Sequence, residues 1–168
     1  MATDHDLQRL SARVGRRLLA AGARLTTAES CTGGWIARCI TDVAGSSQWF
    51  DGGFVTYSNE AKRRDLGVPK STLDRAGAVS ELTVRAMARG ALNRTGVDVA
   101  IAVSGIAGPD GALTGKPVGT VWFAVAQRRG KAIDVAAQLR TFRGDREQVR
   151  RKAVQFGLKM LLEPAFIQ

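Results

Sequence analysis

One short segment, residues 97–103, constrains the fold more than any other because it is almost wholly apolar. A strand of this composition is typical of a sheet that helices cover on both faces, since side chains pointing either way are then buried. The preceding segment is helical in pattern. After Ser80, which can cap a helix, apolar residues recur at positions 84, 87, 88, 91 and 92, the spacing of an amphipathic helix. Together these segments predict an α/β fold with a buried sheet.

Strands and helices alternate along the rest of the chain as well. The Arg-Arg-Gly sequence at 128–130 has the spacing of a hairpin turn, so the sheet is predicted to be mixed. The closing helix begins at Asp145, with Gln148 as its capping-box partner. No repeat or linker divides the sequence, so we expect one domain across residues 1–168. The other expected elements are helices over the first 20 residues, through 35–40 and over 60–66 (capped by Asn59), and strands at 24–28, 53–57, 118–126 and 132–139.

Several classes of protein are excluded by what the sequence lacks. No apolar run approaches the roughly 20 residues of a membrane span. A single His and two Cys leave almost no material for a Ser/His/Asp triad, a disulfide framework or a four-ligand zinc site, so we expect neither a metal nor another cofactor. The first ten residues lack the pattern of a signal peptide, and we expect a cytoplasmic protein.

Basic residues give the chain a net charge of +10, and residues 128–152 contribute +6 of it. Such a segment fits a nucleic-acid binder, a site for a phosphorylated small ligand, or a solvated surface. The only aromatic residue between 128 and 152 is Phe142. This counts against a platform on which bases stack, so nucleic acid is the less favoured partner.

Three polar segments, at 29–34, 57–62 and 104–111, follow predicted strands. Ligands of open α/β sheets usually bind beyond the carboxyl ends of strands, so we expect these segments to form one site. Hydroxyls, flexible glycines and the N–H groups at the start of a helix suit a phosphate or carboxylate, and the third segment offers N–H groups for an oxyanion or phosphate. Capping of a helix and a plain turn remain the alternatives. The residues concerned are Ser30, Thr32, Gly33 and Gly34 in the first segment, and Ser104 and Gly105 in the third.

A serine and a lysine are the candidate catalytic pair, because the chain has no usable histidine. A lysine activates a serine when burial or neighbouring cations keep its amine partly neutral, and Arg143 and Arg146 are the cations that could reach it. The residues alone also allow a structural interpretation, in which Ser46 caps a helix and Lys62 is solvated. Cys31 is interpreted as a small buried residue.

Six strings in order carry a resemblance to a known family. They are T-T-A-E-S-C-T-G-G at 26–34, A-G-S-S-x-W-F at 44–50, G-F-V-T-Y-S-N-E-A-K at 53–62, G-A-V-S-E at 77–81, S-G-I-A-G-P-D-G at 104–111 and K-P-V-G-T-V-W-F at 116–123, and G-D-R follows at 144–146. With them the chain resembles the CinA C-terminal domain family. The resemblance implies a three-layer α/β/α sandwich, a homo-oligomer, and hydrolysis of the carboxamide of nicotinamide mononucleotide (NMN) to nicotinic acid mononucleotide and ammonia, without a metal.

The resemblance also implies roles for individual residues. Ser47 and Lys62 match the family's serine and lysine, with Tyr57 beside them, and Ser30 is a competing candidate for the nucleophile. Expected substrate-binding residues are Ser30, Thr32, Gly33, Gly34, Ser46, Ser104, Gly105 and Arg146. A nucleic-acid binder and a catalytically silent nucleotide-binding module are the alternative functions.

Overall fold

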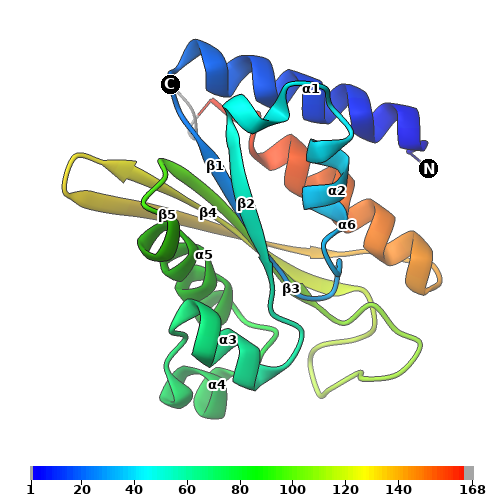
Figure 1. Ribbon diagram of the computed structural model, residues 1–168. Coiled ribbons are helices and arrows are strands. Elements are labelled where there is room, and N and C mark those ends of the chain that lie inside the picture. The colour runs from blue at the N-terminus through cyan, green and yellow to red at the C-terminus, as the bar shows by residue number, and fades with distance from the viewer. Residues whose placement is uncertain (1, 165–168) are drawn as a thin grey trace.

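The apolar segment singled out in the sequence forms the middle strand of a five-stranded sheet (Figure 1). The computed structural model describes residues 2–164. The strand order is β2-β1-β3-β4-β5, in which β1, β2 and β3 are parallel and β4 and β5 are antiparallel to their neighbours. The predicted mixed sheet is therefore confirmed. The strands are β1 (Leu25–Glu29), β2 (Phe50–Val55), β3 (Val99–Gly105), β4 (Thr120–Arg129) and β5 (Ala132–Thr141).

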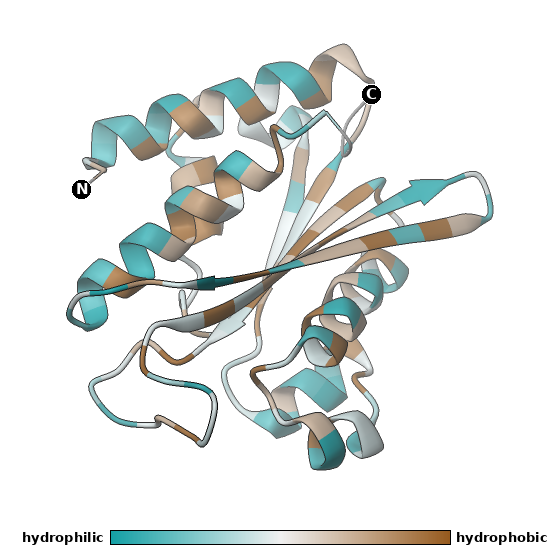
Figure 2. Ribbon diagram, turned by 180° about the vertical axis from the view of Figure 1, so that it is seen from behind, coloured by the Kyte–Doolittle hydropathy of each residue, from teal (hydrophilic) through white to brown (hydrophobic). Residues whose placement is uncertain are grey.

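Helices cover both faces of the sheet, which confirms the three-layer α/β/α architecture (Figure 1). One face carries α1 (Asp4–Ala20), α2 (Trp35–Thr41) and α6 (Arg146–Met160); the other carries α3 (Asn59–Leu66), α4 (Lys70–Ala76) and α5 (Glu81–Thr95). A short 3-10 helix, η1 (Ser46–Gln48), leads into β2. Figure 2 shows hydrophobic residues on the inner sides of these layers and hydrophilic ones outside.

The middle strand explains how the core divides into two. Val99, Ile101 and Val103 pack with the side chains of α1, α2 and α6, whereas Ala100 and Ala102 pack with α5. All five are at most 1% exposed, and full burial of a Val or Ile side chain stabilises the fold by about 1.5–3 kcal/mol. The small alanines let α5 lie close to the sheet.

The register brings the carboxyl ends of three strands to one edge of the sheet. Glu29, the last residue of β1, is opposite Val55 of β2 and Val103 of β3. The segments that follow these strands therefore begin side by side, as predicted for ligand sites of open α/β sheets.

Differences from the predicted elements are local. The helix α4 is missing from the prediction because it has only seven residues and buries only Leu73. Ser58, not Asn59, caps α3, since the Ser58 hydroxyl accepts a hydrogen bond from the Ala61 N–H. The caps predicted for α5 (Ser80) and α6 (Asp145 with Gln148) are confirmed.

Candidate functional site

A buried serine and lysine meet at the carboxyl edge of the parallel strands. Ser30 follows β1 directly, and its N–H donates to the Val103 carbonyl of β3. Lys62 lies on α3, the helix after β2, and is only 1% exposed. Its Nζ is 2.9 Å from Ser30 Oγ. Of the two serines considered as nucleophile, Ser30 is the one beside the lysine.

Two carbonyl groups orient the lysine amine. Lys62 Nζ is 2.8 Å from the Thr56 carbonyl oxygen and 3.5 Å from that of Tyr57. Nζ is the donor in these contacts and in the one to Ser30 Oγ. Once the amine is neutral, its two N–H bonds can stay with the carbonyl oxygens, and its lone pair is free to accept the Ser30 proton. The arrangement allows the amine to accept the proton of Ser30.

Burial lowers the pKa of Lys62 from 10.5 to about 8, because a charged ammonium loses its hydration there. Cys31 is the next influence and acts in the opposite direction. Of the two causes expected from the sequence, burial or neighbouring cations such as Arg143 and Arg146, burial is therefore the one that lowers this pKa. An amine with a pKa near 8 is partly neutral at physiological pH, as a general base requires.

The pair opens into a cleft of about 170 Å³. The cleft is also lined by Tyr57, Gly105 and Arg146, which confirms that the three polar segments converge. A side chain at Gly105 would bring its Cβ within 2.6 Å of Val121, so only glycine keeps the backbone at this position. Ser104 also borders the cleft, but its hydroxyl donates to the Ala78 carbonyl.

Arg146 joins two loops at the rim of the cleft. Its guanidinium donates to the Gly108 carbonyl at 2.7 Å and to the Tyr57 hydroxyl at 2.8 Å. Tyr57 is 62% exposed, and its phenol bonds to Arg146 while its backbone carbonyl faces Lys62. Arg146 and Tyr57 are thus positioned at the entrance, where a bound ligand would pass.

A buried carboxylate, that of Glu29, stabilises the turn after Ser30 through hydrogen bonds. Glu29 accepts hydrogen bonds from the Thr32 hydroxyl and from the N–H groups of Ile36 and Ala37, at 2.7–3.0 Å. Burial raises the pKa of this carboxyl, and the bonds from Thr32, Ala37 and Ile36 act against that rise. Glu29 therefore caps α2, whose N-cap residue Gly34 provides no side-chain bond.

This cap occupies groups that were expected to bind the ligand. Thr32 is fully buried and its hydroxyl is bonded to Glu29. The first N–H groups of α2 are likewise used by Glu29 instead of being open to an anion. Gly33 and Gly34 instead border a second cavity between α2 and α6.

Ser46 and Ser47 lie at the other end of the sheet. They belong to η1, which precedes β2, whereas Lys62 follows β2. The six residues of β2 separate the two ends, and a strand rises about 3.3 Å per residue. The structure therefore does not bring Ser47, which is exposed, or Ser46, which is buried, to Lys62.

Cys31 borders the cleft, but burial raises the pKa of its thiol to about 12, with the negative charge of Glu29 as the next cause. A thiol with this pKa is protonated at neutral pH and is a poor nucleophile. Within residues 2–164, no cluster of three or more His, Cys, Asp or Glu side chains could hold a metal ion.

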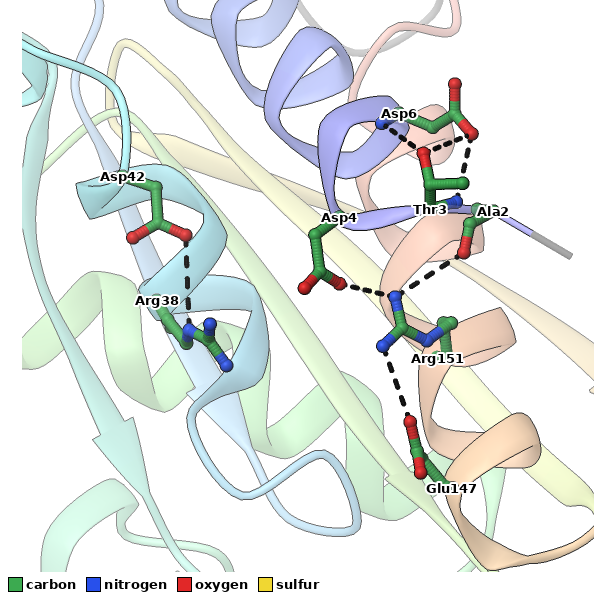
Figure 3. Close-up of polar contacts among 8 residues, drawn as sticks. All are labelled: Ala2, Thr3, Asp4, Asp6, Arg38, Asp42, Glu147 and Arg151. Carbon is green, nitrogen blue, oxygen red and sulfur yellow. Dashed lines mark hydrogen bonds and ion pairs between the residues drawn. The ribbon is translucent and has the colours of Figure 1, made fainter.

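Much of the basic C-terminal segment serves the fold. Arg150 donates to the carbonyls of Cys31 and Thr32, which ties α6 to the Ser30 turn. Arg151 bonds to Asp4 and Glu147, as Figure 3 shows. Arg128 donates to the Leu92 carbonyl.

Among the helices described, none is long and apolar enough to cross a membrane.

Sequence reasoning missed some residues that build the site, namely Glu29 and Arg150, which hold the Ser30 turn. The one available signal for Glu29 was its position at the end of a buried strand, directly before Ser30. Arg150 gave no such signal, because its bonds span 118 and 119 positions of the chain.

Comparison with known proteins adds the family. A model of the CinA C-terminal domain matches residues 7–164. "Nicotinamide-nucleotide amidohydrolase PncC" of Escherichia coli (strain K12) is 56% identical over 159 residues, covering 95% of this chain and 94% of that protein. The protein of the same name from Pseudomonas putida is 52% identical over 154 residues, covering 92% and 94%. Among solved structures, the competence damage-inducible protein A (ComA) of Klebsiella pneumoniae matches with a TM-score of 0.90 at 45% identity, covering 96% of this chain and 99% of that one.

Proposed function

The chain belongs to the CinA C-terminal domain family, and from this membership we propose that it is a nicotinamide-nucleotide amidohydrolase with Ser30 as its nucleophile and Lys62 as its base. The reaction converts NMN and water to nicotinic acid mononucleotide and ammonia. The observation that carries the assignment of the pair is the 2.9 Å contact between Ser30 Oγ and the buried Lys62 Nζ inside a cleft.

The proposed reaction proceeds in two halves. Neutral Lys62 takes the proton of the Ser30 hydroxyl while Oγ attacks the carboxamide carbon. Lys62 then returns the proton to the departing nitrogen, and the C–N bond breaks to release ammonia. Water hydrolyses the resulting ester, with Lys62 again acting as the base, which regenerates Ser30 and gives the carboxylate product.

The remaining residues at the cleft bind and orient the substrate in this proposal. Backbone N–H groups of the loop that begins at Gly105 donate to the carbonyl oxygen as its negative charge develops. Tyr57 and Arg146 contact the nucleotide at the entrance, where their side chains are bonded to each other.

Ammonia release from NMN tests both the activity and the choice of serine. We expect turnover by the wild-type protein and a loss of several orders of magnitude in Ser30→Ala, because removal of a nucleophile leaves only binding and electrostatic effects. Ser47→Ala is the matched variant, since it removes the same hydroxyl at the far end of the sheet, and it should keep near-native turnover.

Three results would overturn parts of this proposal. A folded wild-type protein that releases no ammonia would overturn the activity. Full activity in Ser30→Ala would overturn the nucleophile. Loss of activity in Ser47→Ala alone would return the role to the serine first expected from the sequence.

A further inference from the structure

A second cavity adjoins the cleft and lies between α2 and α6. Its volume is about 590 Å³, and Arg146 lines both this cavity and the cleft. The cavity is also lined by Trp35, Arg38, Glu147 and Arg150. Because Arg146 lines both spaces, a ligand with one end at Ser30 and the other in this cavity would pass Arg146.

The cavity carries an excess of positive charge. Arg146 bonds to a carbonyl and a phenol, and Arg150 bonds to two carbonyls, so the acceptors of both are neutral. Neither arginine takes part in an ion pair among residues 2–164. The single carboxylate in the lining is that of Glu147. It pairs at 3.4 Å with Arg151, a residue that does not line the cavity (Figure 3).

The third guanidinium is only loosely engaged. Arg38 is exposed, and its Nε is 4.0 Å from a carboxylate oxygen of Asp42 (Figure 3). Three guanidinium groups thus face one space with one carboxylate, which is already paired. Guanidinium groups form paired hydrogen bonds with both carboxylates and phosphates. A phosphate monoester carries about −1.5 to −2 charge and three acceptor oxygens, so three guanidinium groups match it better than they match a singly charged carboxylate.

Two glycines without side chains form part of the cavity wall and leave room for a phosphate group. Gly33 and Gly34 adopt positive φ values of 62° and 89°. A Cβ on Gly33 would lie 3.3 Å from the Arg150 guanidinium. Because Glu29 already occupies the first N–H groups of α2, the arginine side chains supply the charge.

We propose that this cavity is the subsite for the phosphate monoester of the substrate, bound by Arg38, Arg146 and Arg150. The inference rests on the proposed function for the position of the carboxamide at Ser30. It assigns the residues that make the protein prefer a nucleoside monophosphate to the corresponding nucleoside. Trp35 stabilises the subsite from one side, since the guanidinium of Arg150 lies 5.4 Å from its ring centre.

Calorimetric titration with inorganic phosphate at constant ionic strength tests the subsite without any turnover. Arg38→Gln should raise the Kd for phosphate about tenfold, the usual effect of losing one charge-assisted hydrogen bond. Among residues 2–164, the Arg38 side chain forms only the 4.0 Å ion pair with Asp42, and it is exposed, so this variant should fold normally. Arg89→Gln is the matched control, because it removes the same charge from an exposed position on α5 and should leave the Kd unchanged.

A second measurement compares NMN with nicotinamide riboside, which has the same carboxamide and no phosphate. The ratio of kcat/KM for the two should fall about tenfold in Arg38→Gln and stay constant in Arg89→Gln. Equal phosphate affinity in wild type and Arg38→Gln, no phosphate binding at all, or an unchanged ratio would each overturn the subsite. If phosphate binding depends on Arg38 but no ammonia is released from either compound, the subsite stands and the proposed function fails.

Discussion

At the scale of single residues, the burial of one amine decides which chemistry is available. Lys62 is surrounded by carbonyl oxygens and a hydroxyl, and no carboxylate forms an ion pair with it among the described residues. The charged ammonium loses its hydration on burial, and the neutral oxygens around it replace that hydration only in part. The same surroundings keep Cys31 protonated, which is why the proposed reactive pair is Lys62 and Ser30 and not the thiol.

The lowered pKa of Lys62 predicts the pH dependence of catalysis. Only the neutral amine can accept the Ser30 proton, and the neutral fraction grows as pH rises towards about 8. We expect kcat/KM for NMN to rise about tenfold per pH unit below that value and to level off above it. Steady-state rates of ammonia release between pH 5.5 and 9.5 measure this limb.

Lys62→Arg provides the control for this profile. A guanidinium stays charged throughout the range, so the variant should be inactive at every pH even if it folds. A flat wild-type profile from pH 6 to 9, or substantial activity in Lys62→Arg, would contradict the role of Lys62 as the base.

At the scale of secondary-structure elements, the position of Lys62 depends on how closely two helices approach. The carbonyl oxygen of Leu66, at the end of α3, lies against Gly90 in the middle of α5. A Cβ at Gly90 would lie only 2.0 Å from that oxygen. Glycine at this position therefore sets the distance between α3 and α5, and with it the position of Lys62.

Gly90→Ala tests this contact, because the two competing effects have opposite signs. Alanine in a helix interior is ordinarily about 1 kcal/mol more favourable than glycine. Here the clash with backbone should outweigh that gain and lower the free energy of unfolding by about 1–3 kcal/mol, the typical cost of overpacking. Urea unfolding followed by circular dichroism measures it, and turnover should fall as well.

Asn93→Ala is the comparison within the same helix, since Asn93 is exposed and its change to alanine removes no contact with α3. It should leave stability unchanged or slightly raise it. An increase in stability in Gly90→Ala would show that α3 moves freely and that the close approach does not position Lys62.

At the scale of the whole molecule, the layered architecture could be predicted because its signals are local. The apolar strand, the amphipathic helix after Ser80 and the hairpin spacing each lie within one stretch of sequence. The choice between Ser30 and Ser47 could not be predicted from the sequence, since both serines lie near a glycine and a turn. The strand register, which puts Glu29 opposite Val55, places Ser30 and not Ser47 beside Lys62. The homo-oligomer and the cytoplasmic location stay predictions.

The distribution of basic residues predicts weak binding of nucleic acid. Arg128, Arg150 and Arg151 are engaged with backbone carbonyls or carboxylates of the same chain, which leaves fewer cations for a phosphate backbone. We expect a fluorescently labelled 20-nucleotide DNA to bind more weakly than about 10⁻⁴ M at 150 mM salt, the weak end of non-specific binding. Fluorescence anisotropy at 20 and 150 mM salt measures it, and micromolar binding at 150 mM would favour the nucleic-acid alternative.

The hairpin of β4 and β5 offers a place to attach something to this protein without disturbing its chemistry. The cleft lies beside Gly105, which pairs with Val121 near the start of β4, whereas the hairpin turn at Gly130 lies beyond the other end of that strand. Figure 1 shows this turn projecting past the rest of the sheet. Gly130 itself has a φ of 59°, which disfavours a side chain, so the label belongs on its exposed neighbour Lys131. A fluorophore, an affinity tag or a surface linker there would leave the cleft facing solution.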